Sequence, residues 1–144
     1  MKYSINYENT PKQNDIEILS RGIALNAKQK RGLEHPVPFA FFIRDENNEI
    51  KGGCNGNIGY DWLYVDQLWV EEPLRGKGHG TALLQAAEEL AINKNCVSAA
   101  VNTADWEALD FYKKLGFRVE FERHGLAKNS IFYFLRKDLF KRDK

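Results

Sequence analysis

The order of apolar and polar positions predicts a strand and then a helix at the start of the chain. Apolar residues alternate with polar ones over residues 3–7 (Tyr3, Ile5, Tyr7), as in a half-buried strand. Thr10, Pro11 and Gln13 then have the types expected at the N-cap, first position and capping box of a helix. An apolar stripe at helical spacing follows, and Gly22 within it predicts a weakened helix or a break into two shorter ones.

The rest of the pattern predicts alternating strands and helices. Turn residues separate the apolar runs, and a long apolar stripe after Gly80 predicts a helix that ends near Asn93 or Asn95. The expected strands cover residues 38–43, 50–58, 62–70 and 97–101, with a last helix at 106–115 and a closing hairpin of 117–122 and 131–135. Because a helix precedes strand 97–101, we expect that strand to lie parallel to strand 62–70. Asp105 is the expected N-cap of the last helix, and Gly116 its C-terminal stop.

Composition favours one soluble globular domain spanning residues 1–144. The chain is 43% apolar and 28% charged, and its net charge of +1 favours neither nucleic acid nor a membrane surface as a partner. Residues 1–8 have no continuous apolar segment, so we expect no secretory signal there, and no stretch has the roughly 18 apolar residues of a membrane helix. Cys54 and Cys96 form no metal-type or redox pair. We therefore expect a cytoplasmic protein without a metal site.

Three glycines alternate with basic residues where strand 62–70 gives way to the long helix. Gly76, Gly78 and Gly80 allow backbone amides to approach a ligand, and the first turn of a helix has N–H groups with no internal partner. The positive end of the helix dipole adds to these amides, which together predict a phosphate cradle. No Lys-Ser or Lys-Thr pair follows Gly80, so the loop is not a Walker A motif. The glycine spacing also differs from the dinucleotide-binding fingerprint.

Two motifs in this chain resemble those of the GCN5-related N-acetyltransferase (GNAT) family. The first is Arg-x-x-Gly-x-Gly, formed by Arg75, Gly78 and Gly80 after the strand end Leu68-Trp69-Val70. The second is the run from Asp105 to Phe117, which matches Asn-x-x-Ala-x-x-x-Tyr-x-x-x-Gly-Phe except that Asp105 stands where Asn is usual. The likeness is strong over residues 60–120. Outside this range it rests only on the predicted order of helices and strands.

The resemblance implies an α/β fold and an enzyme. The expected fold is a single mixed, mostly antiparallel twisted sheet of about seven strands flanked by about four helices. In it, the parallel strands four and five (62–70 and 97–101) splay apart to admit the pantetheine arm. The expected activity is transfer of the acetyl group of acetyl-CoA to a primary amine of a small molecule or peptide. A catalytically silent acetyl-CoA or CoA sensor is the alternative, and a homodimer is possible.

The resemblance also implies roles for individual residues. Tyr112 is expected near the cofactor sulfur, where its phenol would protonate the leaving thiolate. Asp66 is the favoured proton acceptor; Glu34 and His35 are alternatives, and a water chain could replace all three. Arg75 either pairs with a phosphate or braces the acidic loop before it. The residues expected to bind the cofactor are Leu68, Trp69, Val70, Arg75, Gly76, Lys77, Gly78, His79, Gly80, Thr81, Asp105 and Tyr112.

Overall fold

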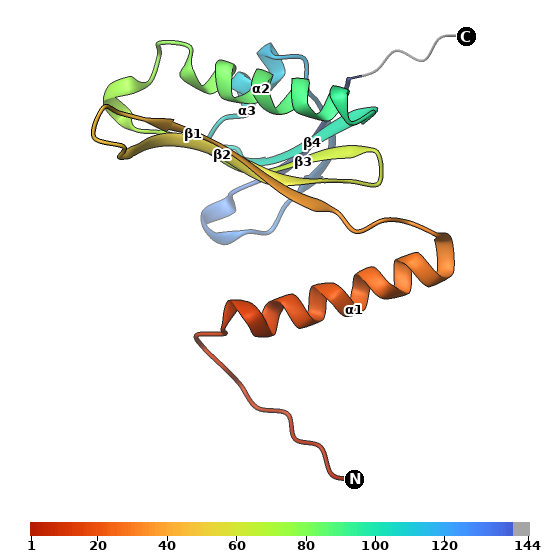
Figure 1. Ribbon diagram of the computed structural model, residues 1–144. Coiled ribbons are helices and arrows are strands. Elements are labelled where there is room, and N and C mark those ends of the chain that lie inside the picture. The colour runs from red at the N-terminus through yellow and green to blue at the C-terminus, as the bar shows by residue number, and fades with distance from the viewer. Residues whose placement is uncertain (140–144) are drawn as a thin grey trace. The chain divides into compact units, whose positions relative to one another are not determined.

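The computed structural model describes residues 1–139, and the chain divides into two compact units, Met1–His35 and Pro36–Lys144. The first unit contains the continuous helix α1 (Gln13–Arg31), coloured red to orange in Figure 1. Gly22 does not break this helix, which ends at Gly32 in the left-handed conformation. Helix propensity therefore outweighs the local cost of Gly22, because one glycine costs only about 1 kcal/mol relative to alanine.

The beginning of the first unit differs from the sequence prediction. Residues 3–7 form no strand, which agrees with the rule that an alternating segment needs a paired neighbour to be stable. The N-cap of α1 is Lys12 rather than Thr10. The Lys12 carbonyl accepts hydrogen bonds from the N–H groups of Asp15 and Ile16, at 3.0 and 3.1 Å. The Thr10 hydroxyl donates to Asn9 Oδ1 instead (3.3 Å), so the predicted capping box is not formed.

The second unit is built on a twisted mixed sheet. Within the described residues the sheet has six strands in the spatial order β1-β2-β3-β4-β6-β5. The strands are β1 (Val37–Arg44), β2 (Ile50–Gly59), β3 (Trp62–Val70), β4 (Ser98–Ala104), β5 (Arg118–Arg123) and β6 (Phe132–Asp138). Only β3 and β4 pair in parallel in this described sheet. The mixed, mostly antiparallel sheet is confirmed, with one strand fewer than expected because residues 3–7 do not contribute one.

Two helices lie on the same side of this sheet, α2 (His79–Asn93) and α3 (Leu109–Lys114) (Figure 1). With α1 they make three α-helices in the described part of the chain, against about four expected. Leu84 of α2, Leu63 of β3 and Tyr112 of α3 all lie in one buried apolar cluster. We call this side the core face and the other the far face. Among residues 1–139 no helix has the length and apolar character needed to cross a membrane.

One extra residue in β3 changes how the sheet continues. Asn55 of β2 lies opposite Gln67, but Gly56 lies opposite Val65, so Asp66 forms a bulge. Leu63 and Val65 point to the core face before the bulge, whereas Leu68 and Val70 pack against the core after it. The change of phase places Asp66 and Gln67 together on the far face.

The parallel strands separate at the same point. β3 pairs with β4 from Trp62 opposite Ser98 to Val65 opposite Val101, and the pairing stops there. Beyond Val65, β3 continues to pair with β2, while β4 continues to pair with β6. The facing edges of β3 and β4 are therefore left unpaired by strands of the described sheet. This is the expected splay.

The last helix begins later than the sequence predicts. Asp105 is not its N-cap, because α3 starts only at Leu109. Two side chains hold the preceding turn in a non-helical conformation. Thr103 Oγ1 accepts a hydrogen bond from the Ala108 N–H (3.1 Å), and Glu107 Oε1 accepts one from the Ala104 N–H (3.1 Å). The Thr103 bond uses the Ala108 N–H, which is one of the donors that the side chain of an N-cap at Asp105 would bond.

Tyr112 of α3 is part of the core rather than of the surface. Its side chain is 6% exposed and contacts the rings of Phe111 and Phe117 edge-on, at centroid distances of 5.2 and 5.6 Å. Burial raises the pKa of Tyr112 to about 12, and the nearby Cys54 and Glu107 add smaller contributions in the same direction. The phenol therefore keeps its proton well above neutral pH.

We expect Gly56→Ala to destabilise the second unit severely. A Cβ at Gly56 would overlap the backbone carbonyl oxygen of Tyr64 and lie 3.0 Å from the Asp66 N. Backbone atoms cannot rotate away, so the free energy of unfolding should fall by about 3 kcal/mol, the upper end for overpacking. Gly22→Ala is the control, because a Cβ there meets nothing within 4 Å and should stabilise α1 by about 0.5–1 kcal/mol. Urea denaturation measures both, and equal stabilities would contradict the packing at Gly56.

The raised pKa of Tyr112 predicts a specific loss of stability at high pH. An unfolded tyrosine has a pKa of about 10, so the unfolded chain releases this proton before the folded one does. Stability from the neutral phenol is complete below about pH 10 and is lost as the pH rises towards the folded value of about 12. Two pKa units correspond to about 3 kcal/mol. Denaturation of Tyr112→Phe across this range should therefore show a smaller loss than the parent protein; identical losses would contradict the assignment.

Candidate functional site

The loop between β3 and α2 contains two glycines in a conformation that other residues rarely adopt. It begins with a short 3-10 turn, η1 (Glu72–Leu74), and ends at the first residue of α2. Gly76 and Gly78 have φ angles of +76° and +87°, and a Cβ at either position would meet nothing within 4 Å. The glycines are required here by backbone conformation, and the space beside them is open.

The first turn of α2 offers free hydrogen-bond donors to this space. Gly78 is the N-cap residue and, as a glycine, has no side chain to make a cap bond. The first turn of α2 contains no acidic residue. The N–H groups of His79, Gly80 and Thr81 therefore lie at the positive end of the helix without an acceptor from within it. A cavity of about 310 Å³ adjoins them, lined by Val70, Leu74, Arg75, Gly76, Gly78, His79, Gly80, Thr81 and Phe111. Such an arrangement favours an anion such as a phosphate group.

The basic residues of the loop mainly hold it in place. Arg75 Nε donates a hydrogen bond to the Val70 carbonyl (2.8 Å), which ties the loop to the end of β3. Arg75 thus braces the strand end, and the acidic Glu71 pairs instead with Lys51 (3.7 Å). His79 Nδ1 lies 3.2 Å from the Leu74 carbonyl, so the ring contacts the loop backbone. Lys77 is exposed and is not among the residues that line the cavity.

The end of β3 presents different side chains to its two faces. Leu68 and Val70 pack against the core, whereas Trp69 is half exposed on the far face. Their backbone forms the edge that faces β4 beyond the last paired residue, Val65. Unpaired N–H and C=O groups on such an edge can bond an extended ligand that carries amides. Val70 also lines the glycine-loop cavity, so the edge and the cradle meet at this residue.

Tyr112 lies on the core face, close to the end of β3. Tyr112 lies close enough to Cys54 for the thiol to affect its pKa, and Cys54 is the cross-strand partner of Leu68. Asp105 has different partners from Tyr112 and Cys54. Its N–H donates a hydrogen bond to the Ile131 carbonyl (2.9 Å), and its side chain is exposed. Cys54 itself is 1% exposed, and burial raises its pKa to about 11, so it is a protonated core thiol.

Asp66 lies on the opposite side of the strand from Tyr112. It lines a cavity of about 370 Å³ with Asn57, Tyr64, Val65, Ala100 and Asn102, at the level where β3 and β4 separate. Of the alternative proton acceptors, Glu34 pairs with Lys28 at 3.7 Å within the first unit, and His35 belongs to that unit as well.

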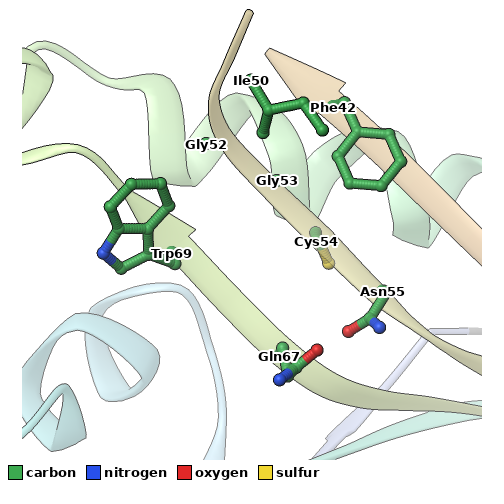
Figure 2. Close-up of a pocket in the computed structure, with 8 residues that line it drawn as sticks. All are labelled: Phe42, Ile50, Gly52, Gly53, Cys54, Asn55, Gln67 and Trp69. Carbon is green, nitrogen blue, oxygen red and sulfur yellow. The ribbon is translucent and has the colours of Figure 1, made fainter.

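Sequence reasoning missed several residues that shape these cavities. Phe111 lines the glycine-loop cavity, and a Cβ at Gly80 would lie 3.3 Å from its ring. Its position immediately before Tyr112 in the second motif was the available signal. A further cavity on the far face, lined by β1, β2 and β3, was not predicted (Figure 2). It depends on residues from three strands, and no local motif indicates it.

Comparison with known proteins agrees with these features. The model of the acetyltransferase (GNAT) family matches residues 7–117. Blasticidin-S acetyltransferase of Streptomyces morookaense is 37% identical over 103 residues, which cover 69% of this chain and 76% of that protein.

Two solved structures share the fold. A protein of Agrobacterium tumefaciens named as an acetyltransferase superposes with a TM-score of 0.84 at 25% identity, covering 94% of this chain and 99% of its own. A Bacillus anthracis protein named as a streptothricin acetyltransferase, crystallised with acetyl coenzyme A, has a TM-score of 0.63 at 20% identity and covers 72% of this chain and 63% of its own. At 20% identity, the similarity to the Bacillus anthracis protein shows only a shared fold. Since the family model spans well over half of the sequence, the chain belongs to the GNAT family of acetyltransferases and is an acyltransferase.

Proposed function

We propose that this protein transfers the acetyl group of acetyl-CoA directly to the primary amine of a small molecule. The observation that carries the proposal is the cradle of free amides at the start of α2, which meets at Val70 the edge of β3 that no strand pairs with. The Bacillus anthracis neighbour binds acetyl-CoA on the same fold, and the Streptomyces relative is named for blasticidin S rather than for a protein.

The donor would be held by backbone more than by side chains. Amides of His79, Gly80 and Thr81 would bind the diphosphate, and the positive-φ turn at Gly76 and Gly78 would let it approach closely. The edge of β3 at residues 68–70 would bond the pantetheine amides. Arg75 would keep loop and strand in register through its bond to the Val70 carbonyl. Lys77 would contribute mainly positive charge near the phosphates, and the His79 ring would stay against the Leu74 carbonyl.

Residues on the two faces of the sheet, beside the gap between β3 and β4, would then carry out the two proton transfers of the reaction. The amine nitrogen bonds to the thioester carbonyl carbon, the bond from that carbon to sulfur breaks, the amine loses a proton and the sulfur gains one. Asp66, on the far face, would accept the amine proton, directly or through water. Tyr112, on the core face, would donate to the sulfur, and its raised pKa keeps it protonated at neutral pH.

We expect Gly78→Glu to abolish acetyl-CoA binding. The added carboxylate would enter the cradle and repel the diphosphate, so affinity should fall roughly 100-fold or more, because like charges placed together cost several kcal/mol. Gly125→Glu is a matched control, since Gly125 has a φ of +85°, close to the +87° of Gly78, and a Cβ there also meets nothing within 4 Å. Calorimetric titration with acetyl-CoA, and with ATP and NAD as controls, measures both. Equal affinities in the two variants would remove the cradle assignment.

We expect Tyr112→Phe and Asp66→Asn each to lower turnover while leaving acetyl-CoA binding intact. Loss of a positioned acid or base costs roughly 100-fold in kcat at the lower end of its usual range. Released CoA is measured with a panel of primary amines, and binding by calorimetry. Tyr60→Phe, in the turn between β2 and β3, is the control for removing a phenolic oxygen elsewhere. Full turnover in either variant would withdraw the role given to that residue.

A further inference from the structure

The far face of the sheet holds a cavity beside the end of β3. Its volume is about 220 Å³, and its lining residues come from β1, β2 and β3. We call it the aromatic trough and define it by Phe42, Gly53, Asn55, Gln67 and Trp69. In Figure 2 the rings of Trp69 and Phe42 stand on either side of the β2 backbone, and the amides of Asn55 and Gln67 lie together at the other end.

The floor of the aromatic trough is the glycine backbone of β2. A Cβ at Gly53 would lie 2.9 Å from the Phe41 carbonyl oxygen and 2.9 Å from Phe42 Cδ1, so the Phe42 ring leans over the space that a side chain would fill. Phe42 and Trp69 are both 51% exposed. Two half-exposed rings across a flat peptide floor suit a flat apolar group, because aromatic stacking adds to the burial of area.

The polar groups of the aromatic trough are neutral amides. Asn55 and Gln67 are direct cross-strand partners. Among the described residues, the Asn55 Oδ1 is a buried oxygen with no hydrogen-bond partner. A buried acceptor without a donor is costly, so a ligand N–H that meets it after a rotation of the amide would gain that energy. The lining side chains carry no charge, and the Arg44 guanidinium lies 5.3 Å from the Phe42 ring centroid. A polycation would find no counter-charge there.

The bulge connects the aromatic trough to the proposed acid-base chemistry. Gln67 lines the trough and its neighbour Asp66 lines the next cavity, and both side chains lie on the far face because the bulge shifts the phase of β3. Trp69 precedes Val70, the residue at which the strand edge meets the glycine-loop cavity. A molecule seated in the trough thus lies one residue along the strand from the proposed base.

We propose that the aromatic trough binds the body of the amine acceptor, a neutral planar group with an amide-like hydrogen-bonding edge, and so sets acceptor specificity. This inference rests on the proposed acetyl transfer. The planar body lies between Trp69 and Phe42, its N–H edge meets Asn55 and Gln67, and its amine points along β3 towards Asp66.

An amine panel tests the class of acceptor. We expect 3-(aminomethyl)benzamide, whose amide and aminomethyl group lie on the same side of the ring, to have a KM roughly 10-fold below that of benzylamine, which lacks the amide edge, as for one added hydrogen bond in a buried site. Benzylamine should in turn be better than cyclohexylmethylamine, which is not planar, and than spermidine, which is a polycation. Benzamide, which has no amine to acetylate, should inhibit competitively against the amine. A panel in which spermidine or cyclohexylmethylamine is preferred would overturn the proposal.

Variants identify the residues responsible. Trp69→Ala removes a stacked ring but keeps the backbone edge of β3, so KM for 3-(aminomethyl)benzamide should rise roughly 10-fold with little change in acetyl-CoA affinity. Asn55→Ala should remove the preference for 3-(aminomethyl)benzamide over benzylamine without changing KM for benzylamine. Phe121→Ala is the matched control, a β5 phenylalanine that is 55% exposed. Equal effects of Trp69→Ala and Phe121→Ala would show that the trough does not bind the acceptor.

A binding measurement separates failure of the trough from failure of the proposed function. The fluorine NMR signal of 4-fluorobenzamide should broaden with the parent protein and sharpen again with Trp69→Ala, whether or not any amine is acetylated. Absence of broadening, with acetyl-CoA binding intact, overturns the trough alone. Broadening without acetyl-CoA binding supports the trough as a binding site and overturns the proposed transfer.

Discussion

The site depends on one irregularity of backbone pairing, the extra residue Asp66 in β3. The bulge needs β2 to approach β3 closely at Gly56, where a Cβ would overlap the Tyr64 carbonyl. At the same level β3 stops pairing with β4, although each strand keeps its other neighbour. The sheet therefore stays continuous through its outer pairs while a gap opens between two parallel strands. The core tolerates this because Leu68 and Val70 still pack inward after the change of phase.

The same irregularity places the two residues proposed as acid and base on opposite faces of the sheet. On the core face, Tyr112 lies among aromatic rings, and burial raises its pKa to about 12. On the far face, Asp66 and Gln67 stand side by side in a polar setting. A group buried in the core holds its proton, whereas a carboxylate outside the core can accept one. In the proposed transfer, a proton donor and a proton acceptor on opposite sides of this gap would serve the leaving sulfur and the attacking amine.

Backbone groups account for the proposed anion site. Gly76 and Gly78 take left-handed conformations, and the first turn of α2 has no side-chain cap to use up its amides. Arg75, which could have bound a phosphate directly, donates its Nε–H to the Val70 carbonyl. Loop, helix start and strand end thus form one connected unit. In the aromatic trough, Gly53 leaves room for the Phe42 ring, whose Cδ1 would lie 2.9 Å from a Cβ at that position.

The sequence alone determined the family, the parallel pairing after the long helix and the loop that forms the cradle, because each depends on local residue types at fixed spacing. Gly78 and Gly116 have the positive φ angles that their places in the motifs require. Other predictions failed where a distant partner or a local competitor decides: residues 3–7 form no strand, and Thr103 takes the Ala108 N–H that an N-cap at Asp105 would bond. Only the tertiary structure brings Phe42, Asn55 and Trp69 around Gly53, since pairing in register joins three strands that no sequence pattern relates.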